Sequence, residues 1–400
     1  MQVRIDRLGH RGDGIAPGPI FVPRTLPGEL VEGEAEDDRI ARPTVIERSP
    51  ERVEPDCPNY DACGGCDLMH ASDPFVGRWK VDVVRQALQA RDLPAPIVGI
   101  ATSSAQSRRR AVLSAKGGTI GFHGRRSHRV VATTGCHVLV PEIEQALPML
   151  ARLARAAGSD KAELSLTVIA GKNGLDVTVR GGADPKGGTL TTLAEMAAEA
   201  DLARLTVNGE PVFQSRPASV LFAGVPVEPP PGGFLQATGH GQSALLASVS
   251  KALGEAGRIA DLFAGCGTFA LPLSKRAEIH AVEGDGALLD AAAAAWRGTR
   301  GHRTLTTETR DLFREPLGPD ELSRFDGVVI DPPRAGAEAQ SRELAQSSVP
   351  RVAAVSCNPV TFARDAQILL AGGYRLDWIR VVDQFRWSPH VEVAAAFQRP

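Results

Sequence analysis

The feature that most constrains the fold is a regular alternation of apolar and amphipathic segments in the C-terminal part of the chain. Five apolar segments read as buried strands, namely R-I-A-D-L-F, E-I-H-A-V-E, T-L-T-T-E, D-G-V-V-I-D and V-A-A-V-S-C. Helical segments accompany them at residues 241–254, 268–276, 286–297, 338–347 and 360–371, and two further strands follow. This alternation predicts a Rossmann-like α/β domain with a doubly wound parallel sheet. Such sheets bind ligands outside the carboxyl ends of their strands.

The sequence before this region predicts two further domains. Residues 1–48 alternate short apolar runs with glycine and proline, which is typical of a small β-barrel of the oligonucleotide-binding (OB) kind. Residues 49–226 mix strand-like and helical segments and predict a central α+β domain. The run V-E-P-P-P-G-G at 227–233 indicates a linker, so the α/β domain is expected over 227–400.

Composition places the chain among ordinary soluble proteins. Hydrophobic residues make up 43% and charged residues 23% of its 400 residues. No apolar run approaches the ~20 residues of a membrane helix, and the first residues lack the apolar core of a signal peptide. We therefore expect a cytoplasmic protein with no membrane partner, and we favour a monomer.

The net charge of −2 conceals a local excess of positive charge. Between residues 101 and 140 there are seven Lys or Arg, three His and no acidic side chain. This stretch contains R-R-R at 108–110 and G-F-H-G-R-R-S-H-R at 121–129. Such an excess can bind phosphates, although the charge alone slightly favours a solvated basic surface.

The residues that follow the first three strands of the α/β domain indicate a nucleoside-binding pocket. D-L-F-A-G-C-G-T-F ends the first strand, where Gly265 and Gly267 allow a close approach of the backbone and Thr268 opens the next helix. Glu283 ends the second strand, where an acid can accept two ribose hydroxyls. Asp311 follows the third strand, within reach of an adenine edge. Together these residues fit S-adenosylmethionine better than a dinucleotide, whose usual motif is G-x-G-x-x-G.

Two motifs that follow the fourth and fifth strands supply candidate reactive groups. Asp331 begins D-P-P-R, and Cys357 lies in S-C-N-P at a strand-to-helix turn, where a helix N-terminus is expected to lower the thiol pKa. A thiolate that adds to C6 of a pyrimidine makes C5 nucleophilic toward a methyl sulfonium. A base must then remove the C5 proton, and Glu392 in H-V-E is a candidate, although a surface charge at a sheet edge is the simpler interpretation.

Four of the six cysteines have the spacing of metal ligands. Cys57, Cys63 and Cys66 lie in C-P-N-Y-D-A-C-G-G-C, and Cys136 lies in the middle of the chain. Four thiolates suit either zinc or an iron–sulfur cluster, and spacing alone favours zinc. Cys266 lies in the glycine turn of the nucleoside pocket and is interpreted as a bystander.

Six motifs in this order resemble those of the S-adenosylmethionine-dependent RNA uracil-C5 methyltransferases, particularly the iron–sulfur branch that modifies ribosomal RNA. The motifs are C-P-N-Y-D-A-C-G-G-C, F-L-Q-A-T, D-L-F-A-G-C-G-T-F, D-P-P-R-A-G, S-C-N-P and D-Q-F-R-W-S-P-H-V-E. The resemblance covers positions 57–392, and the order of the motifs makes it specific.

The resemblance implies a role for each of these sites. Cys357 would be the nucleophile that adds to C6, and Glu392 the base that takes the C5 proton. A [4Fe-4S] cluster, rather than zinc, would lie on the four spaced cysteines. The N-terminal barrel would be a TRAM domain, and this barrel and the basic stretch of the middle domain would bind the RNA. The target uridine would be flipped into the pocket. The residues implied to line the S-adenosylmethionine pocket are Gln236, Phe263, Thr268, Glu283, Asp311 and Asp331.

The sequence departs from the family pattern at two positions, and alternatives remain. Thr238 stands where the F-x-Q-x-N motif has Asn, and Thr268 stands where some relatives have Asn, although its hydroxyl can still cap a helix. The expected substrate is 23S ribosomal RNA. The alternatives are a transfer-RNA uracil-C5 methyltransferase, an enzyme acting on cytosine, and a noncatalytic iron–sulfur protein that binds RNA.

Overall fold

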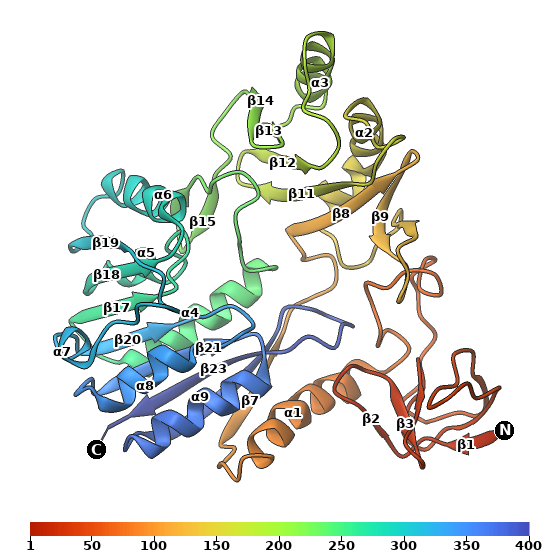
Figure 1. Ribbon diagram of the computed structural model, residues 1–400, viewed down its shortest axis with the longest axis horizontal. Helices are drawn as coiled ribbons and strands as arrows, with labels where there is room; N and C mark the ends of the chain where they lie inside the picture. The colour runs from red at the N-terminus through yellow and green to blue at the C-terminus, as the bar shows by residue number, and fades with distance from the viewer. Residues whose placement is uncertain (400) are drawn as a thin grey trace.

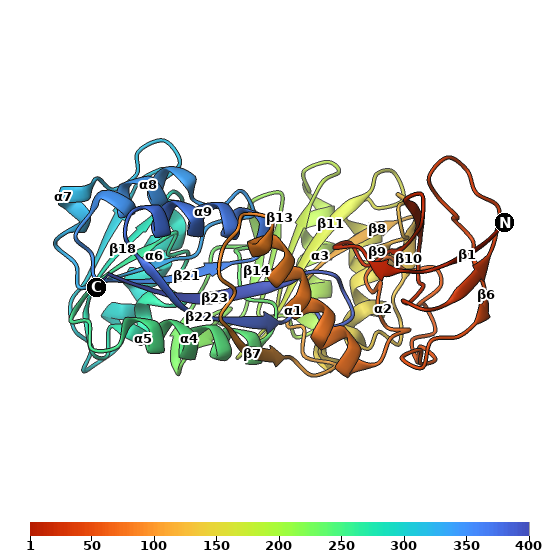
Figure 2. The ribbon, with the colours of Figure 1, turned by 90° about the horizontal axis from the view of Figure 1, so that it is seen from below.

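The computed structural model describes residues 1–399, which form three parts joined end to end (Figures 1 and 2). An α/β part at one end carries the C-terminus, a second sheet with two helices lies in the middle, and a small β part at the other end carries the N-terminus. Within these residues no helix has both the length and the apolar character needed to cross a membrane.

The C-terminal part is built on one mixed sheet of eight strands. Its central strands form because their residues are almost all buried and apolar, as in β17 and β21, so that both faces need covering. Every adjacent pair is parallel except the two pairs made by β23, which runs antiparallel to both of its neighbours. The strands in spatial order are β19 (Leu305–Thr309), β18 (Glu278–Glu283), β17 (Arg258–Leu262), β20 (Gly327–Ile330), β21 (Arg351–Ser356), β23 (Glu392–Gln398), β22 (Arg375–Asp383) and β7 (Ile97–Thr102).

Helices cover both faces of this sheet, so that the sheet is the middle layer of three (Figure 2). One core lies under α4, α5 and α6, and the other lies under α1, α7, α8 and α9. The predicted helix at 286–297 coincides with α6, whereas the one predicted at 268–276 is shortened to α5. The helices are α1 (Asp73–Gln89), α4 (Gly239–Leu253), α5 (Ala270–Leu273), α6 (Gly286–Arg297), α7 (Pro319–Leu322), α8 (Glu338–Gln346) and α9 (Pro359–Ala371).

Two segments depart from the predicted domain boundaries. Helix α1 and strand β7 were placed in the central domain, but β7 pairs with β22 at the edge of the C-terminal sheet, and α1 buries Val84 and Leu88 in the core of that sheet. The hairpin β15 (Val220–Phe222) and β16 (Val225–Val227) also packs into the C-terminal core. Local sequence pattern marks these segments as strand or helix, but it does not reveal which distant core they join.

The middle part is a seven-stranded sheet with α2 (Pro141–Ala156) and α3 (Gly188–Glu199) packed against it. Alternating apolar side chains of β8 and β11 face the helices, and Leu113, Leu166 and Val168 are completely buried. The strands in spatial order are β10 (Val130–Ala132), β9 (Thr119–His123), β8 (Arg110–Lys116), β11 (Leu164–Gly171), β12 (Gly174–Arg180), β13 (Arg204–Val207) and β14 (Glu210–Gln214).

The N-terminal part consists of two separate three-stranded antiparallel sheets around a small apolar core. The core includes Val3, Ile5, Val22 and Val31. The short strands agree with the expected β composition, and the TRAM identity remains a prediction. One sheet contains β1 (Gln2–Arg4), β5 (Leu30–Glu32) and β6 (Thr44–Glu47), and the other contains β2 (Arg7–Leu8), β3 (Gly14–Ala16) and β4 (Ile20–Val22).

Candidate active site

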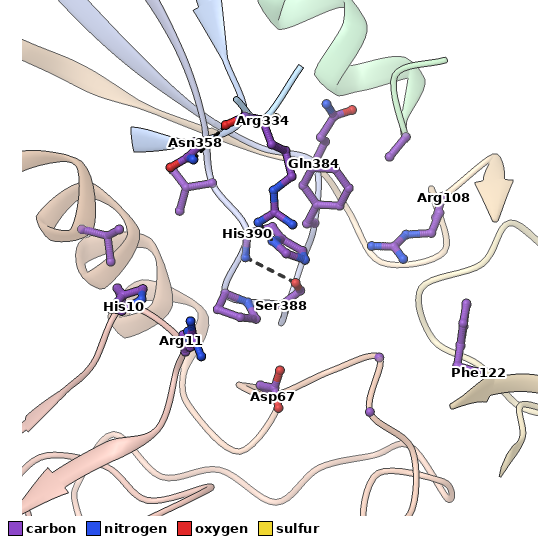
Figure 3. Close-up of a pocket in the computed structure, with 18 of the residues that line it drawn as sticks. His10, Arg11, Asp67, Arg108, Phe122, Arg334, Asn358, Gln384, Ser388 and His390 are labelled. Atoms are coloured by element: carbon purple, nitrogen blue, oxygen red, sulfur yellow. Dashed lines mark hydrogen bonds between the residues drawn. The ribbon is translucent and has the colours of Figure 1, made fainter. Parts of the chain in front are cut away.

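Cys357 lies at the turn between β21 and α9, on the wall of a groove of about 1320 Å³. Asn358 fixes this turn, because its side-chain oxygen accepts a hydrogen bond from the Val360 N–H at 3.1 Å and so caps α9. All three parts of the chain contribute to the groove (Figure 3): Arg334 and His390 lie on one side, and His10 lies opposite.

Glu392, the first residue of β23, lies beside Cys357 at the same end of the sheet. The register pairs Ser356 with Val393, so the residues that follow and precede these partners are neighbours. Only 4% of Glu392 is exposed. Burial and the nearby Asp331 carboxylate raise the pKa of Glu392 to about 8, and a hydrogen bond from Gln384 opposes this rise. The structure therefore places a buried carboxyl group, rather than a surface charge, next to the cysteine.

The pKa of the Cys357 thiol is raised, so the expectation that the helix N-terminus would lower it is wrong. Burial is the largest cause, followed by the carboxylates of Glu392 and Asp331, while Arg334 opposes them. These three effects outweigh the dipole of α9 because the thiol is partly shielded from water and faces two acids. Arg334 is held near the thiol because its backbone oxygen accepts a hydrogen bond from the Asn358 side chain at 3.0 Å.

Gln236 and Asp331 lie between this centre and the predicted cofactor pocket. The Gln236 side chain donates to Asp331 Oδ2 at 3.4 Å, and Gln384 donates to both Gln236 Oε1 and Glu392 Oε2. Burial raises the pKa of Asp331 to about 7. Gln384 is the second residue of the motif D-Q-F-R-W-S-P-H-V-E, and no role was predicted for it.

The glycine turn after β17 leaves open space where a cofactor is expected. Gly265 has a positive φ of 54°, and a Cβ at this position would meet nothing within 4 Å. Gly267 also has a positive φ, but a Cβ there would lie 2.9 Å from Leu271, so this glycine serves packing instead. The Gly265 N–H donates to Glu283 Oε2 at 3.0 Å, which fixes the acid that ends β18 beside the turn.

The other predicted pocket residues surround this turn. The ring of Phe263 lies 5.3 Å from that of Phe313, and Asp311 Oδ1 accepts the Phe313 N–H at 3.0 Å. Thr268 lies within the turn, but it does not cap α5, whose N-cap is Phe269 without a side-chain hydrogen bond. The predicted capping role of Thr268 is therefore wrong, because the helix begins two residues later.

Asp261 is a buried acid that sequence reasoning missed, although it begins the quoted D-L-F-A-G motif. It is fully buried on β17, and neither carboxylate oxygen has a hydrogen-bond partner. Burial, with the carboxylates of Asp331 and Glu283, raises its pKa to about 8. Nearby Cys266 is buried in the core, and burial raises its pKa to about 12, in agreement with an inert packing role.

The four spaced cysteines lie near one another. Asn59 in the first loop donates to the Thr134 oxygen at 2.7 Å, two residues before Cys136, and Cys63 pairs with Gly124. Burial raises the pKa of Cys66 to about 12, with Cys136 as the next cause. Within residues 1–399, however, no three His, Cys, Asp or Glu side chains are arranged so that they could hold a metal ion. The structure thus brings the predicted ligands to one region without gathering them into a metal site.

Most arginines of the basic stretch bind other parts of the protein. Arg109 donates to Gln242, and Arg110 donates to the Gly233 oxygen, so both tie the middle sheet to the C-terminal part. Arg125 and Arg126 pair with Asp13 of the N-terminal part, which is 4% exposed. The excess of positive charge read from the sequence is therefore partly neutralised at contacts between the three parts.

Comparison with solved structures defines the class of protein. The tRNA (uracil-54, C5)-methyltransferase of Pyrococcus abyssi, solved with S-adenosyl-L-homocysteine, superposes with a TM-score of 0.76 over 99% of both chains at 23% identity. The chain therefore shares the fold of that methyltransferase over nearly its whole length. The family model described as tRNA (Uracil-5-)-methyltransferase matches residues 308–399.

Comparison with curated sequences gives the family. An uncharacterized RNA methyltransferase of Rhizobium meliloti is 41% identical over 99% of both chains. The 23S rRNA (uracil(1939)-C(5))-methyltransferase of Vibrio parahaemolyticus is 30% identical over 99% of this chain and 95% of its own. The chain belongs to the RNA uracil-C5 methyltransferases, and it is an S-adenosylmethionine-dependent enzyme that acts on RNA.

Proposed function

We propose that this enzyme methylates C5 of a uridine in 23S ribosomal RNA, with Cys357 as nucleophile and Glu392 as base. The observation that carries the proposal is the position of these two residues, which are neighbours at one end of the sheet, where Cys357 lines the large groove and Glu392 is buried beside it. The name of the Vibrio parahaemolyticus relative and the cysteine motif support the ribosomal substrate.

The reaction follows from the two groups in order. The Cys357 thiol gives its proton to the Asp331 carboxylate, which faces it and whose pKa burial raises to about 7, so that Glu392 keeps its carboxylate free for the later step. The thiolate adds to C6 of the uracil, and C5 becomes nucleophilic. S-adenosylmethionine supplies the electrophilic methyl group. Glu392 then removes the C5 proton, the C5–H electrons form the C5–C6 double bond, and the C6–S bond breaks to release the thiolate.

The cofactor residues are assigned by their position around the glycine turn. Glu283 would bind the ribose, Phe263 and Asp311 the adenine, and Asp331 and Gln236 the end that carries the methyl group, with Thr268 lining the turn. The open space above Gly265 supports this assignment. The buried Asp261 and Asp331 carboxyl groups also favour a positively charged ligand at this place.

The test of this function uses a tritiated methyl donor with undermodified ribosomal RNA and, separately, transfer RNA. We expect label in 5-methyluridine of 23S RNA, and Cys357→Ala is expected to abolish transfer because no covalent adduct can form. Gln346→Met, on the exposed end of α8, is the matched control and should retain activity. No label in any uridine would refute the proposal.

Transfer RNA is the second candidate substrate. The matching family model and the Pyrococcus abyssi structure both carry transfer-RNA names. Label found in transfer RNA and absent from 23S RNA in the same assay would select this alternative.

We also propose that Cys57, Cys63, Cys66 and Cys136 hold a [4Fe-4S] cluster. The thiols fit in chemistry, because four soft donors of one kind lie in one region, and the pKa of Cys66, Cys63 and Cys136 is raised partly by the other thiols. Bound iron would compensate this mutual repulsion and tie the two loops together.

Absorbance and metal analysis test the cluster. Protein purified without oxygen should be brown, with about four irons per chain, and Cys63→Ser should lose both colour and iron. Cys266→Ser is the matched control, because that thiol lies in the C-terminal core, and this variant should stay brown. A colourless wild-type protein that contains zinc would overturn the assignment.

A further inference from the structure

Gln384 lies between β22 and the loop that leads to Glu392. It contacts several groups of the reaction centre, although no role was predicted for it from the sequence. Its side chain is 2% exposed. Its Nε2 donates to Glu392 Oε2 and to Gln236 Oε1, and its Oε1 accepts the Thr238 N–H at 3.3 Å. It therefore links the proposed base to the proposed cofactor side of the pocket.

The orientation of the Gln384 amide is determined by these partners. A backbone N–H can only donate, so the atom that faces Thr238 must be the amide oxygen. The amide nitrogen then faces the two oxygens of Gln236 and Glu392, both of which can accept. All three groups are satisfied in this orientation, whereas a flipped amide would oppose a donor to a donor.

Thr238 supplies the fixed end of this arrangement. Its hydroxyl accepts the Gly241 N–H at 2.9 Å and caps α4, and it also bonds the Ser103 hydroxyl at 2.7 Å. Threonine therefore replaces the Asn of the family motif without loss of the cap. The backbone N–H of Thr238 is held in place by the start of α4, and this aims the amide of Gln384.

The backbone of Gln384 is anchored on both sides. The preceding residue, Asp383, pairs with Lys80 of α1 at 2.5 Å, and both side chains are almost completely buried. Lys80 also donates to the oxygen of Phe385, the following residue, at 3.0 Å. A side chain held between two such anchors can fix the position of a neighbouring carboxylate.

We propose that Gln384 is a positioning residue, which holds Glu392 as a carboxylate with Oε2 engaged and Oε1 left to accept the C5 proton. Its bond to Gln236 couples this orientation to the cofactor side of the pocket. The inference rests on the proposed function of Glu392 and adds to it the group that sets the geometry of the base.

The charged groups around Glu392 give the direction of the pH effect. Asp331 after β20, Asp383 on β22 and the Cys357 thiol after β21 all face it, and the first two raise its pKa together with burial. The hydrogen bond from Gln384 lowers the pKa of Glu392 because it stabilises the carboxylate. Without this bond, a higher pH is needed for the same fraction of ionised base.

The test replaces Gln384 with methionine, which has a similar length and forms no such hydrogen bonds. Methyl transfer to C5 should persist, but release should slow by roughly 10- to 100-fold, a part of the ~10²–10⁴ that a positioned base contributes. The methylated RNA should then remain covalently attached to Cys357 and migrate with the protein in a denaturing gel. The acidic limb of the pH–rate profile should move to higher pH.

Controls separate the possible outcomes. Gln346→Met makes the same change on the exposed end of α8 and should match the wild type. Gln384→Asn keeps the amide on a shorter side chain, and its rate of release should lie between those of the wild type and Gln384→Met. This variant preserves the test if the methionine variant does not fold. Unchanged turnover and pH profile, or an equal loss of adduct formation and release, would overturn the proposal. A wild-type enzyme without methyl transfer would instead refute the proposed function.

Discussion

At the scale of single residues, Asp261 is a carboxyl group whose charged form is disfavoured by its surroundings. Its carboxyl is fully buried, and its pKa is raised from 3.8 to about 8, first by burial. The unfolded chain releases this proton near pH 4, whereas the folded protein keeps it. Between these pH values the unfolded state binds fewer protons, so the free energy of unfolding falls as pH rises.

We expect Asp261→Asn to remove part of this pH dependence in the absence of cofactor. The free energy of unfolding should fall less steeply with rising pH, by up to ~1.4 kcal/mol per pH unit, which is the limit for one titrating group. Urea denaturation at pH 5 and pH 8 measures it. Asp290→Asn, an exposed change on α6, should leave the slope as in the wild type. Equal slopes for Asp261→Asn and the wild type would contradict the raised pKa.

Residue types and motif order predicted which side chains gather at the site, but not their environment. Cys357 and Glu392 could be placed because each follows or begins a strand of a sheet whose ligand edge is known. The predicted direction of the shift in the Cys357 pKa was wrong because this pKa depends on Glu392 and Asp331, whose distances from the thiol only the fold determines. Gln384 was missed for the same reason, since its partners lie on two other segments, residues 236–238 and the start of β23.

At the scale of elements, α1 is joined to β22 by a buried ion pair. Lys80→Met would leave Asp383 buried without its partner, and the Phe385 oxygen would lose a donor. We expect this change to lower the free energy of unfolding by ~3–5 kcal/mol, measured by urea denaturation. Arg78→Met removes an exposed charge of the same helix and should cost little.

A second variant tests the cause of this loss. Lys80→Met combined with Asp383→Asn removes both charges and should recover part of the stability, because no isolated charge remains buried. If the double variant is instead less stable than Lys80→Met alone, and the losses from the two changes simply add, then packing rather than charge dominates the loss.

Helices were easier to predict than the partners of strands. The apolar period and caps of α6 and α9 lie within the sequence itself, and the predicted bounds agree to within one residue. Strand β7 has an ordinary apolar pattern too, but its partner β22 lies far along the chain. Pairing of this kind depends on the assembled core, so the segment was assigned to the wrong domain.

At the scale of the whole molecule, the contacts between the three parts were not predictable from charge. Charge alone allowed Arg125 and Arg126 to be part of a phosphate-binding surface or of a solvated one, and the structure pairs both with Asp13 across the junction between the N-terminal and middle parts. A run of like charges shows where counter-charges are needed, and not whether the protein or a nucleic acid provides them.

The pairing of β7 with β22 has a consequence for how the chain acquires its shape. Strand β7 leaves the ribosome long before its neighbour has been synthesised, so it must wait for the last part of the chain. Contacts this distant in sequence are formed slowly, because a long loop has to close first. A fragment that starts at residue 227 would lack β7 and present the edge of β22 to other chains, which favours aggregation. The catalytic sheet thus combines an early segment, β7, with strands made much later, and it is completed only after β22 and β23 have been synthesised.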